Sequence, residues 1–84
     1  MKIIRISAMW CSSCILMKSR FNDVIKNYDV ELIDYDYDLD SDVVAKYNVG
    51  TILPVYIKGN ERLIGEHSKE EIKEFIGDNW WRKY

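Results

Sequence analysis

The only two cysteines of the chain, Cys11 and Cys14, stand three positions apart between a short apolar run and a helical pattern. The run over residues 3–7 predicts a β-strand, and over residues 12–28 apolar side chains recur at steps of three and four, which predicts a helix. A thiol at the start of a helix faces the positive end of the helix dipole, where a thiolate is favoured. A Cys-x-x-Cys pair beside a strand–helix unit therefore predicts a redox pair, although metal sites use the same spacing.

Size and charge restrict the classes of protein to consider. A chain of 84 residues predicts a single domain over residues 1–84, and 48% apolar residues are typical of a globular fold. A net charge of −2 gives no general attraction to nucleic acid or anionic lipid. No apolar run approaches the roughly 20 residues of a membrane span, and the N-terminus lacks a signal-peptide pattern. We expect a cytoplasmic monomer with no nucleic-acid or membrane partner, and in that compartment a thiol pair is more often catalytic or metal-binding than structural.

The pattern of apolar and turn residues predicts further elements beyond the first helix. In chain order they are a strand over residues 30–35, a helix over 41–47, strands over 55–57 and 62–64, and a helix after residue 68. Ser68 and Glu71 match a capping box at the start of the last helix. Trp80 and Trp81 are expected to dock this helix onto the rest of the domain. A helical crossover favours a parallel strand pair and a tight turn an antiparallel one. The order β-α-β-α-β-β-α therefore predicts an α/β fold with a four-stranded mixed sheet flanked by helices.

Three ordered motifs resemble the thioredoxin family over nearly the whole chain. Residues 8–11 are similar to the family's Ala-x-Trp-Cys, residues 51–55 to its cis-proline loop, and residues 65–69 to its Gly-x-x-Ser-Lys. The N-terminal strand and helix of typical thioredoxins have no counterpart here, so the resemblance implies a minimal, glutaredoxin-sized version of the fold. Ser12 and Ser13 stand between the cysteines in place of the family's usual Gly-Pro.

The resemblance also implies roles for individual residues. Cys11 would be the exposed nucleophile and Cys14, one turn into the helix, the resolving thiol. The residues expected to contact substrate are Trp10, Ser12, Leu53 and Pro54. Pro54 would follow a cis peptide bond and face the cysteines, and Leu53 would offer its backbone to a substrate peptide. From the residues alone, Pro54 could also simply start a strand and Trp10 could pack in the core.

Arg5 is unexpected, because a central strand between helices should be apolar on both faces. The family carries at this position a buried aspartate thought to handle the proton of the second cysteine. One interpretation of Arg5 is a positive charge near Cys14 that favours its thiolate and so modulates the pair. The other is that this face of the sheet is partly open, or that an acid such as Asp34 neutralises the charge.

The function expected from these features is that of an enzyme, a thioredoxin-like protein disulfide reductase. It would reduce protein or small-molecule disulfides through a dithiol–disulfide cycle of Cys11 and Cys14, without a bound cofactor. Disulfide-containing proteins would be its substrates, and a thioredoxin reductase or glutathione its electron donor. The alternative is a Cu(I)-binding, metallochaperone-like module that uses Met9-x-Cys11-x-x-Cys14, because thiolates suit Cu(I). Domains of that kind run β-α-β-β-α-β and end in a strand.

Other metal sites are not expected. The aspartates that alternate from Asp34 to Asp42 resemble calcium ligands, but the loop's required glycine and glutamate positions hold Leu39 and Ala45. A structural zinc site needs four ligands, and two cysteines with the lone His67 fall short of that number. The aspartates therefore predict that the end of the strand over residues 30–35, and the segment that leads into the helix over 41–47, are exposed to solvent.

Overall fold

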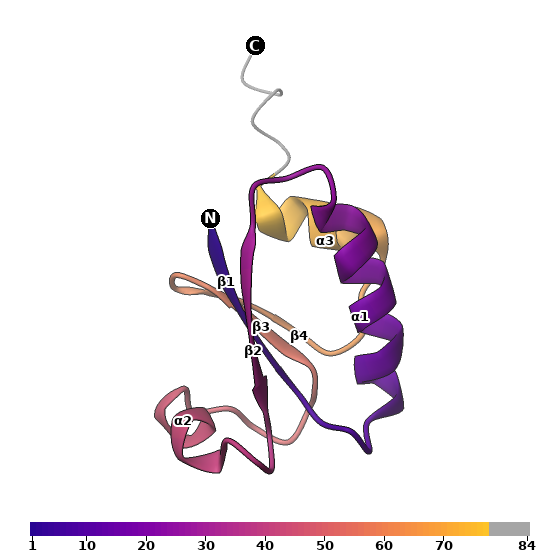
Figure 1. Cartoon of the computed structure of the whole chain (residues 1–84). Coiled ribbons are helices and arrows are strands. Elements are labelled where there is room, and N and C mark those ends of the chain that lie inside the picture. The colour runs from indigo at the N-terminus through magenta and orange to yellow at the C-terminus, as the bar shows by residue number, and fades with distance from the viewer. Residues whose placement is uncertain (78–84) are drawn as a thin grey trace.

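The computed structural model describes residues 1–77, so the expected docking of Trp80 and Trp81 falls outside the described residues. The elements occur in the predicted β-α-β-α-β-β-α order, which is confirmed (Figure 1). They are β1 (Lys2–Ser7), α1 (Ser12–Ile25), β2 (Glu31–Asp36), α2 (Ser41–Lys46), β3 (Val55–Lys58), β4 (Glu61–Ile64) and α3 (Lys69–Ile76). None of these helices is long and apolar enough to cross a membrane. The first helix is shorter than predicted, since it ends at Ile25 rather than at Tyr28.

The four strands form one mixed sheet, as predicted, and lie in the order β2-β1-β3-β4. The strands β1 and β2, joined through α1, are parallel. Both β1 and β4 pair antiparallel with β3. The β3–β4 hairpin closes through Gly59 and Asn60, between the paired residues Lys58 and Glu61. Gly59 has a φ of +60°, a conformation that glycine adopts without steric cost.

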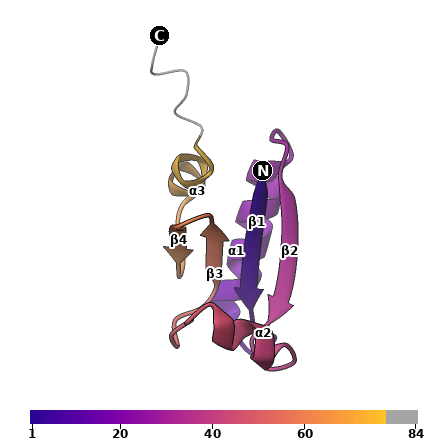
Figure 2. The same ribbon diagram turned by 90° about the vertical axis from the view of Figure 1, so that its left-hand side faces the viewer.

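Helices cover the two faces of the sheet unequally. Both α1 and α3 lie against one face, and α2 lies at the other side, near the end of β2 (Figures 1 and 2). The core beneath α1 and α3 consists of Ile3, Met17, Phe21, Val24, Tyr56, Ile72, Phe75 and Ile76. A second core joins β1, β3, α2 and the first turn of α1, and consists of Ile6, Ala8, Cys14, Val44, Leu53, Val55 and Ile57. The second core therefore reaches the cysteine pair.

The predicted capping box at the start of α3 is confirmed. The Ser68 hydroxyl accepts the N–H of Glu71 at 3.2 Å, and the Glu71 carboxylate accepts the N–H of Ser68 at 3.0 Å. Each side chain satisfies a backbone donor that the helix itself leaves unpaired. At the other end, Gly77 takes a φ of +100° and its N–H bonds the carbonyls of Lys73 and Glu74. Both ends of α3 are therefore hydrogen-bonded.

Acid should weaken this capping box. The hydrogen bond from the Ser68 backbone, followed by that with His67, lowers the pKa of Glu71 from 4.5 to about 2. A carboxylate whose pKa is lowered by folding contributes stability above its unfolded pKa and loses it as the pH falls toward the folded value. Glu71→Gln is therefore expected to be less stable than the wild type near neutral pH, with the difference shrinking between about pH 5 and pH 2. Urea unfolding at several pH values measures this, with Glu70→Gln as the control; a difference independent of pH would contradict it.

Candidate active site

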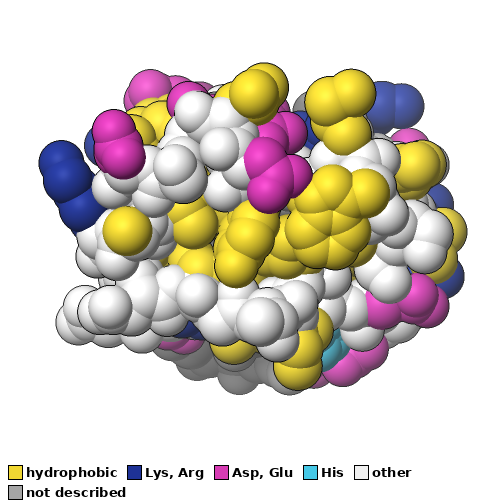
Figure 3. Space-filling view, turned by 90° about the horizontal axis from the view of Figure 1, so that it is seen from below, with side chains coloured by type: hydrophobic (Ala, Val, Ile, Leu, Met, Phe, Trp, Pro, Cys, Tyr) yellow, Lys and Arg dark blue, Asp and Glu magenta, His cyan; other side chains and the backbone are white. Residues whose placement is uncertain are grey.

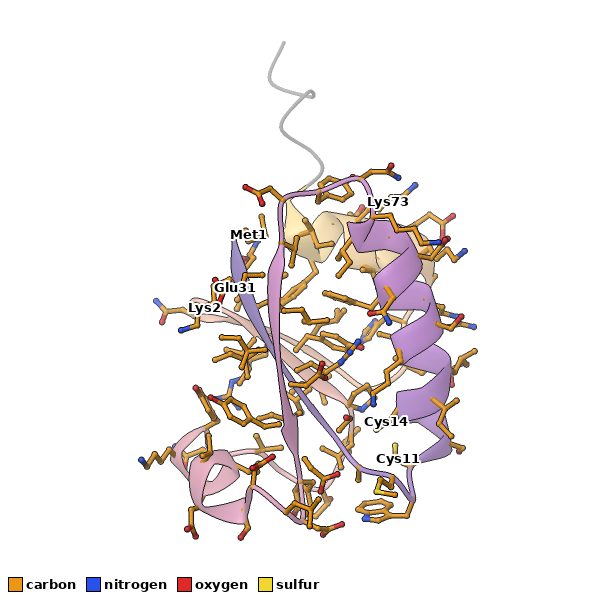
Figure 4. All side chains as sticks on the ribbon, viewed as in Figure 1. Met1, Lys2, Cys11, Cys14, Glu31 and Lys73 are labelled. Atoms are coloured by element: carbon orange, nitrogen blue, oxygen red, sulfur yellow. The ribbon has the colours of Figure 1, made fainter. Side chains whose placement is uncertain are left out.

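The cysteine pair lies where β1 turns into α1 (Figure 4). Cys11 is the N-cap of α1, and its N–H bonds the carbonyl of Ala8 at 3.3 Å, which closes the turn. Cys14 lies in the first turn of the helix. Both cysteines are free thiols, but Cys11 is partly exposed whereas Cys14 is 1% exposed. An external disulfide can therefore reach Cys11 far more easily than Cys14.

The hydrogen bond that the Cys11 sulfur accepts from the backbone suits a thiolate. Its Sγ accepts the backbone N–H of Cys14 at 3.2 Å, in the position that a serine or aspartate oxygen usually takes at an N-cap. The helix dipole adds a partial positive charge at the same end. The Sγ–H of Cys11 also approaches the carbonyl oxygen of Leu53 at 3.7 Å. A negative charge on this sulfur therefore has a backbone donor already in place.

Cys14 has the opposite properties. Burial raises the pKa of its thiol to about 11, and the hydrogen bond with Cys11 acts in the same direction. The positive charge of Lys18 lowers the pKa, but less strongly. Cys14 is thus protonated near neutral pH in the reduced protein. Lys18 was not predicted as a site residue from the sequence, although a spacing of four residues on a helix places it on the same face as Cys14.

The loop before β3 brings a distant segment to the pair. The peptide bond between Leu53 and Pro54 is cis, and both residues are buried. Pro54 precedes β3, which begins at Val55, and the Leu53 carbonyl faces the Cys11 thiol. The structure therefore brings Leu53, Pro54 and Cys11 together, as the resemblance implies.

Trp10 is 63% exposed, so it is not a core residue. Its indole N–H donates to Asp38 at 2.7 Å, and its ring meets that of Tyr37 edge-on with centroids 6.3 Å apart. Figure 3 shows that apolar side chains gather on this end of the molecule, with acidic side chains beside them. Ser12 is also exposed, at the first position of α1. The bond to Asp38 was not foreseen, because its partners are 28 residues apart in the sequence.

Arg5 is buried, with 5% exposure, so an open sheet face does not explain it. Its Nε and Nη2 donate to the two carboxylate oxygens of Asp34 at 2.6 and 3.0 Å, and its Nη1 donates to Asn22 at 3.1 Å. The sheet register sets Arg5 directly beside Asp34 on the parallel strand β2. Asp34 therefore neutralises the guanidinium, as one of the interpretations expects. A modulating effect of Arg5 on the thiols stays a hypothesis.

Within residues 1–77, no group of three or more His, Cys, Asp or Glu side chains is arranged to hold a metal ion. The order of elements also differs from the β-α-β-β-α-β expected for a copper chaperone, because α3 follows β4 in the described chain. The fold therefore favours the redox interpretation of the Cys-x-x-Cys pair.

Comparisons with known proteins agree with this fold. The family model described as Thioredoxin matches residues 1–78, whereas a comparison with curated proteins finds no match. The reduced thioredoxin pre-protein of Schistosoma mansoni is 21% identical, with a TM-score of 0.79 over 92% of this chain and 76% of that one. Mitochondrial thioredoxin 3 of Saccharomyces cerevisiae, in its oxidised form, is 25% identical, with the same TM-score and coverage. Thioredoxin-2 of a malaria parasite is 20% identical, with a TM-score of 0.80 over 92% and 81% of the two chains. The expected thioredoxin-like fold is confirmed, and the chain belongs to the thioredoxin family of thiol–disulfide oxidoreductases.

Proposed function

We propose that the protein is an enzyme that reduces disulfides of proteins or small molecules through Cys11 and Cys14. The observation that carries this proposal is the asymmetry of the two thiols. Cys11 is accessible at a helix N-cap and accepts a backbone N–H, whereas Cys14 is buried with a raised pKa. A pair of this kind assigns attack to one sulfur and resolution to the other.

The reaction proceeds in two exchanges. The Cys11 thiolate attacks one sulfur of the substrate disulfide, so the substrate S–S bond breaks, a mixed disulfide forms, and one substrate thiolate leaves. Cys14 then loses its proton and attacks the Cys11 sulfur, which releases the second substrate thiolate and forms the Cys11–Cys14 bridge. The two thiolates take up protons from solvent. The substrate gains two electrons, and the enzyme dithiol loses them.

The surroundings of Cys11 indicate how a substrate would bind. The Leu53 carbonyl, next to the sulfur, is positioned to accept an N–H from an extended substrate peptide. The indole of Trp10, held by Asp38, offers a flat apolar surface, and Ser12 lies beside Cys11 at the helix start. Pro54 is buried and follows Leu53 across the cis peptide bond. Disulfide-containing proteins fit such a surface best as substrates.

Regeneration needs an external reductant, because the cycle leaves a disulfide between Cys11 and Cys14. A thioredoxin reductase or glutathione supplies the two electrons in this proposal, and the protein acts as a cytoplasmic monomer. No bound cofactor takes part, since thiol–disulfide exchange needs only the sulfurs and a proton acceptor.

An insulin-reduction assay with dithiothreitol as donor tests the proposal. We expect catalytic amounts of the protein to accelerate precipitation of the insulin B chain, and protein alkylated beforehand with iodoacetamide to have no effect. A Cu(I) titration runs in parallel on the reduced protein. Tight stoichiometric binding of Cu(I) without any acceleration of insulin reduction would overturn the proposal in favour of the metallochaperone-like alternative.

A further inference from the structure

A pocket of about 300 Å³ opens beside Cys14, between the end of β1, the start of α1 and the end of β2. Its polar wall is formed by Ser7, Lys18 and Asp36, and Cys14 forms part of the same wall. Neither Cys11 nor Leu53 lines this pocket. The pocket therefore gives access to Cys14, the resolving thiol, on one side. Cys11 faces the cis-proline loop on another side.

The resolving step requires a route by which a proton can leave Cys14, because a buried protonated thiol has to lose its proton before it can attack. Cys14 is 1% exposed and its pKa is raised to about 11. The guanidinium of Arg5 is engaged by Asp34. A pocket of this volume with polar walls is large enough to admit water.

Lys18 is the cation placed to act on Cys14 through the pocket. It lies one helical turn after Cys14, on the same face of α1. Among the ion pairs of residues 1–77, Lys18 takes part in none. The Asp36 carboxylate across the pocket accepts the N–H groups of Asp38 and Leu39, both at 2.9 Å. Lys18 and Cys14 line the same pocket, and the positive charge of Lys18 lowers the pKa of the Cys14 thiol.

We propose that Lys18 is a positioning residue for the resolving step, whose ammonium group stabilises the Cys14 thiolate across this pocket. The S–H bond of Cys14 breaks and the proton passes to solvent through the pocket. The Cys14 thiolate attacks the Cys11 sulfur, and the substrate thiolate leaves. Lys18 stays protonated throughout, so it exchanges no proton or electron. This inference rests on the proposed disulfide reduction by Cys11 and Cys14.

Single-turnover kinetics with a fluorogenic peptide disulfide separate the two exchanges. The first phase reports formation of the mixed disulfide at Cys11, and the second reports its resolution by Cys14. An exposed lysine near a thiol lowers the thiol pKa modestly, so Lys18→Gln should slow the second phase by about threefold to tenfold near neutral pH. The first phase should keep its wild-type rate. Lys18→Arg, which keeps the charge, should restore the second phase.

The pH profile distinguishes an electrostatic role from a structural one. Other groups around Cys14 are Cys11 on its own helix, Asp36 at the end of β2, Tyr56 on β3 and the Arg5–Asp34 pair. All of them are unchanged in Lys18→Gln. The second-phase profile of that variant should therefore move to higher pH, and added salt should shrink its difference from wild type.

Lys46→Gln is the matched control, because Lys46 is an exposed helical lysine on α2, outside the pocket. It should leave both phases unchanged. A second phase in Lys18→Gln equal to that of wild type would overturn this inference alone, and so would equal slowing of both phases. Absence of both phases in the wild-type protein would overturn the proposed function and this inference with it.

Discussion

Replacing Cys11 with serine is expected to reduce insulin reduction to the rate of dithiothreitol alone. Cys14→Ser should instead keep the first exchange and accumulate a mixed disulfide with the substrate. The reason is that only Cys11 has an accessible sulfur with a backbone donor on it, and only Cys14 is placed to attack that sulfur from within. Mass spectrometry of the non-reduced protein after mixing with substrate measures the adduct.

The same asymmetry should appear in alkylation of the reduced wild-type protein. Cys14 is buried and its pKa is raised to about 11, so little of it is thiolate near neutral pH. Iodoacetamide should therefore modify Cys11 first, and peptide mapping identifies the site. Equal modification of both cysteines, or an adduct that accumulates in Cys11→Ser rather than in Cys14→Ser, would reverse the assignment of roles.

The largest loss of stability is expected from Phe21→Ala. Phe21 is fully buried, and its ring stacks on that of Tyr56 with centroids 4.1 Å apart. Truncating a buried phenylalanine to alanine costs about 3–5 kcal/mol, because apolar contacts are lost and a cavity remains. A domain of this size has a total unfolding free energy of about 4–13 kcal/mol. The variant is therefore expected to be near the limit of folding, and urea unfolding measures the change.

Leu39→Ala is the control for this experiment, since Leu39 is 82% exposed. Its unfolding free energy should stay within about 0.5 kcal/mol of the wild type. A loss below about 1 kcal/mol in Phe21→Ala would show that the core beneath α1 and α3 collapses around the missing ring rather than keeping a cavity.

Local sequence patterns predicted the fold well, because the connection between two strands restricts how they pair. A helical crossover favours a parallel pair, and a tight turn favours an antiparallel pair. The end of α1 was predicted less well. Tyr28 continues the apolar periodicity of the helix and packs against the core, yet the helix stops at Ile25. Apolar periodicity indicates which side chains are buried. A side chain in the turn after a helix can be buried just like a side chain within the helix, so the periodicity does not mark where the helix ends.

The candidate site was predictable only in part. The spacing of Cys11 and Cys14 predicted a redox pair from the sequence alone. The expectation that Pro54 lies near them came from the family resemblance. The contact of Trp10 with Asp38 depends on how the loop after β2 lies beside the start of α1. No local pattern encodes this, because the two residues become neighbours only after the sheet has formed.

Within residues 1–77, the two outer strands of the sheet, β2 and β4, each have one side that pairs with no other strand. An unpaired strand is a template onto which another chain can add, and such addition begins many aggregates. Here β2 carries Glu31, Asp34 and Asp36, and β4 carries Glu61 and Arg62. Two copies that approached through β2 would bring carboxylates against carboxylates. The carboxylates of Glu31 and Asp36 are therefore expected to disfavour strand addition at β2, whereas the charge of Asp34 is already compensated by Arg5.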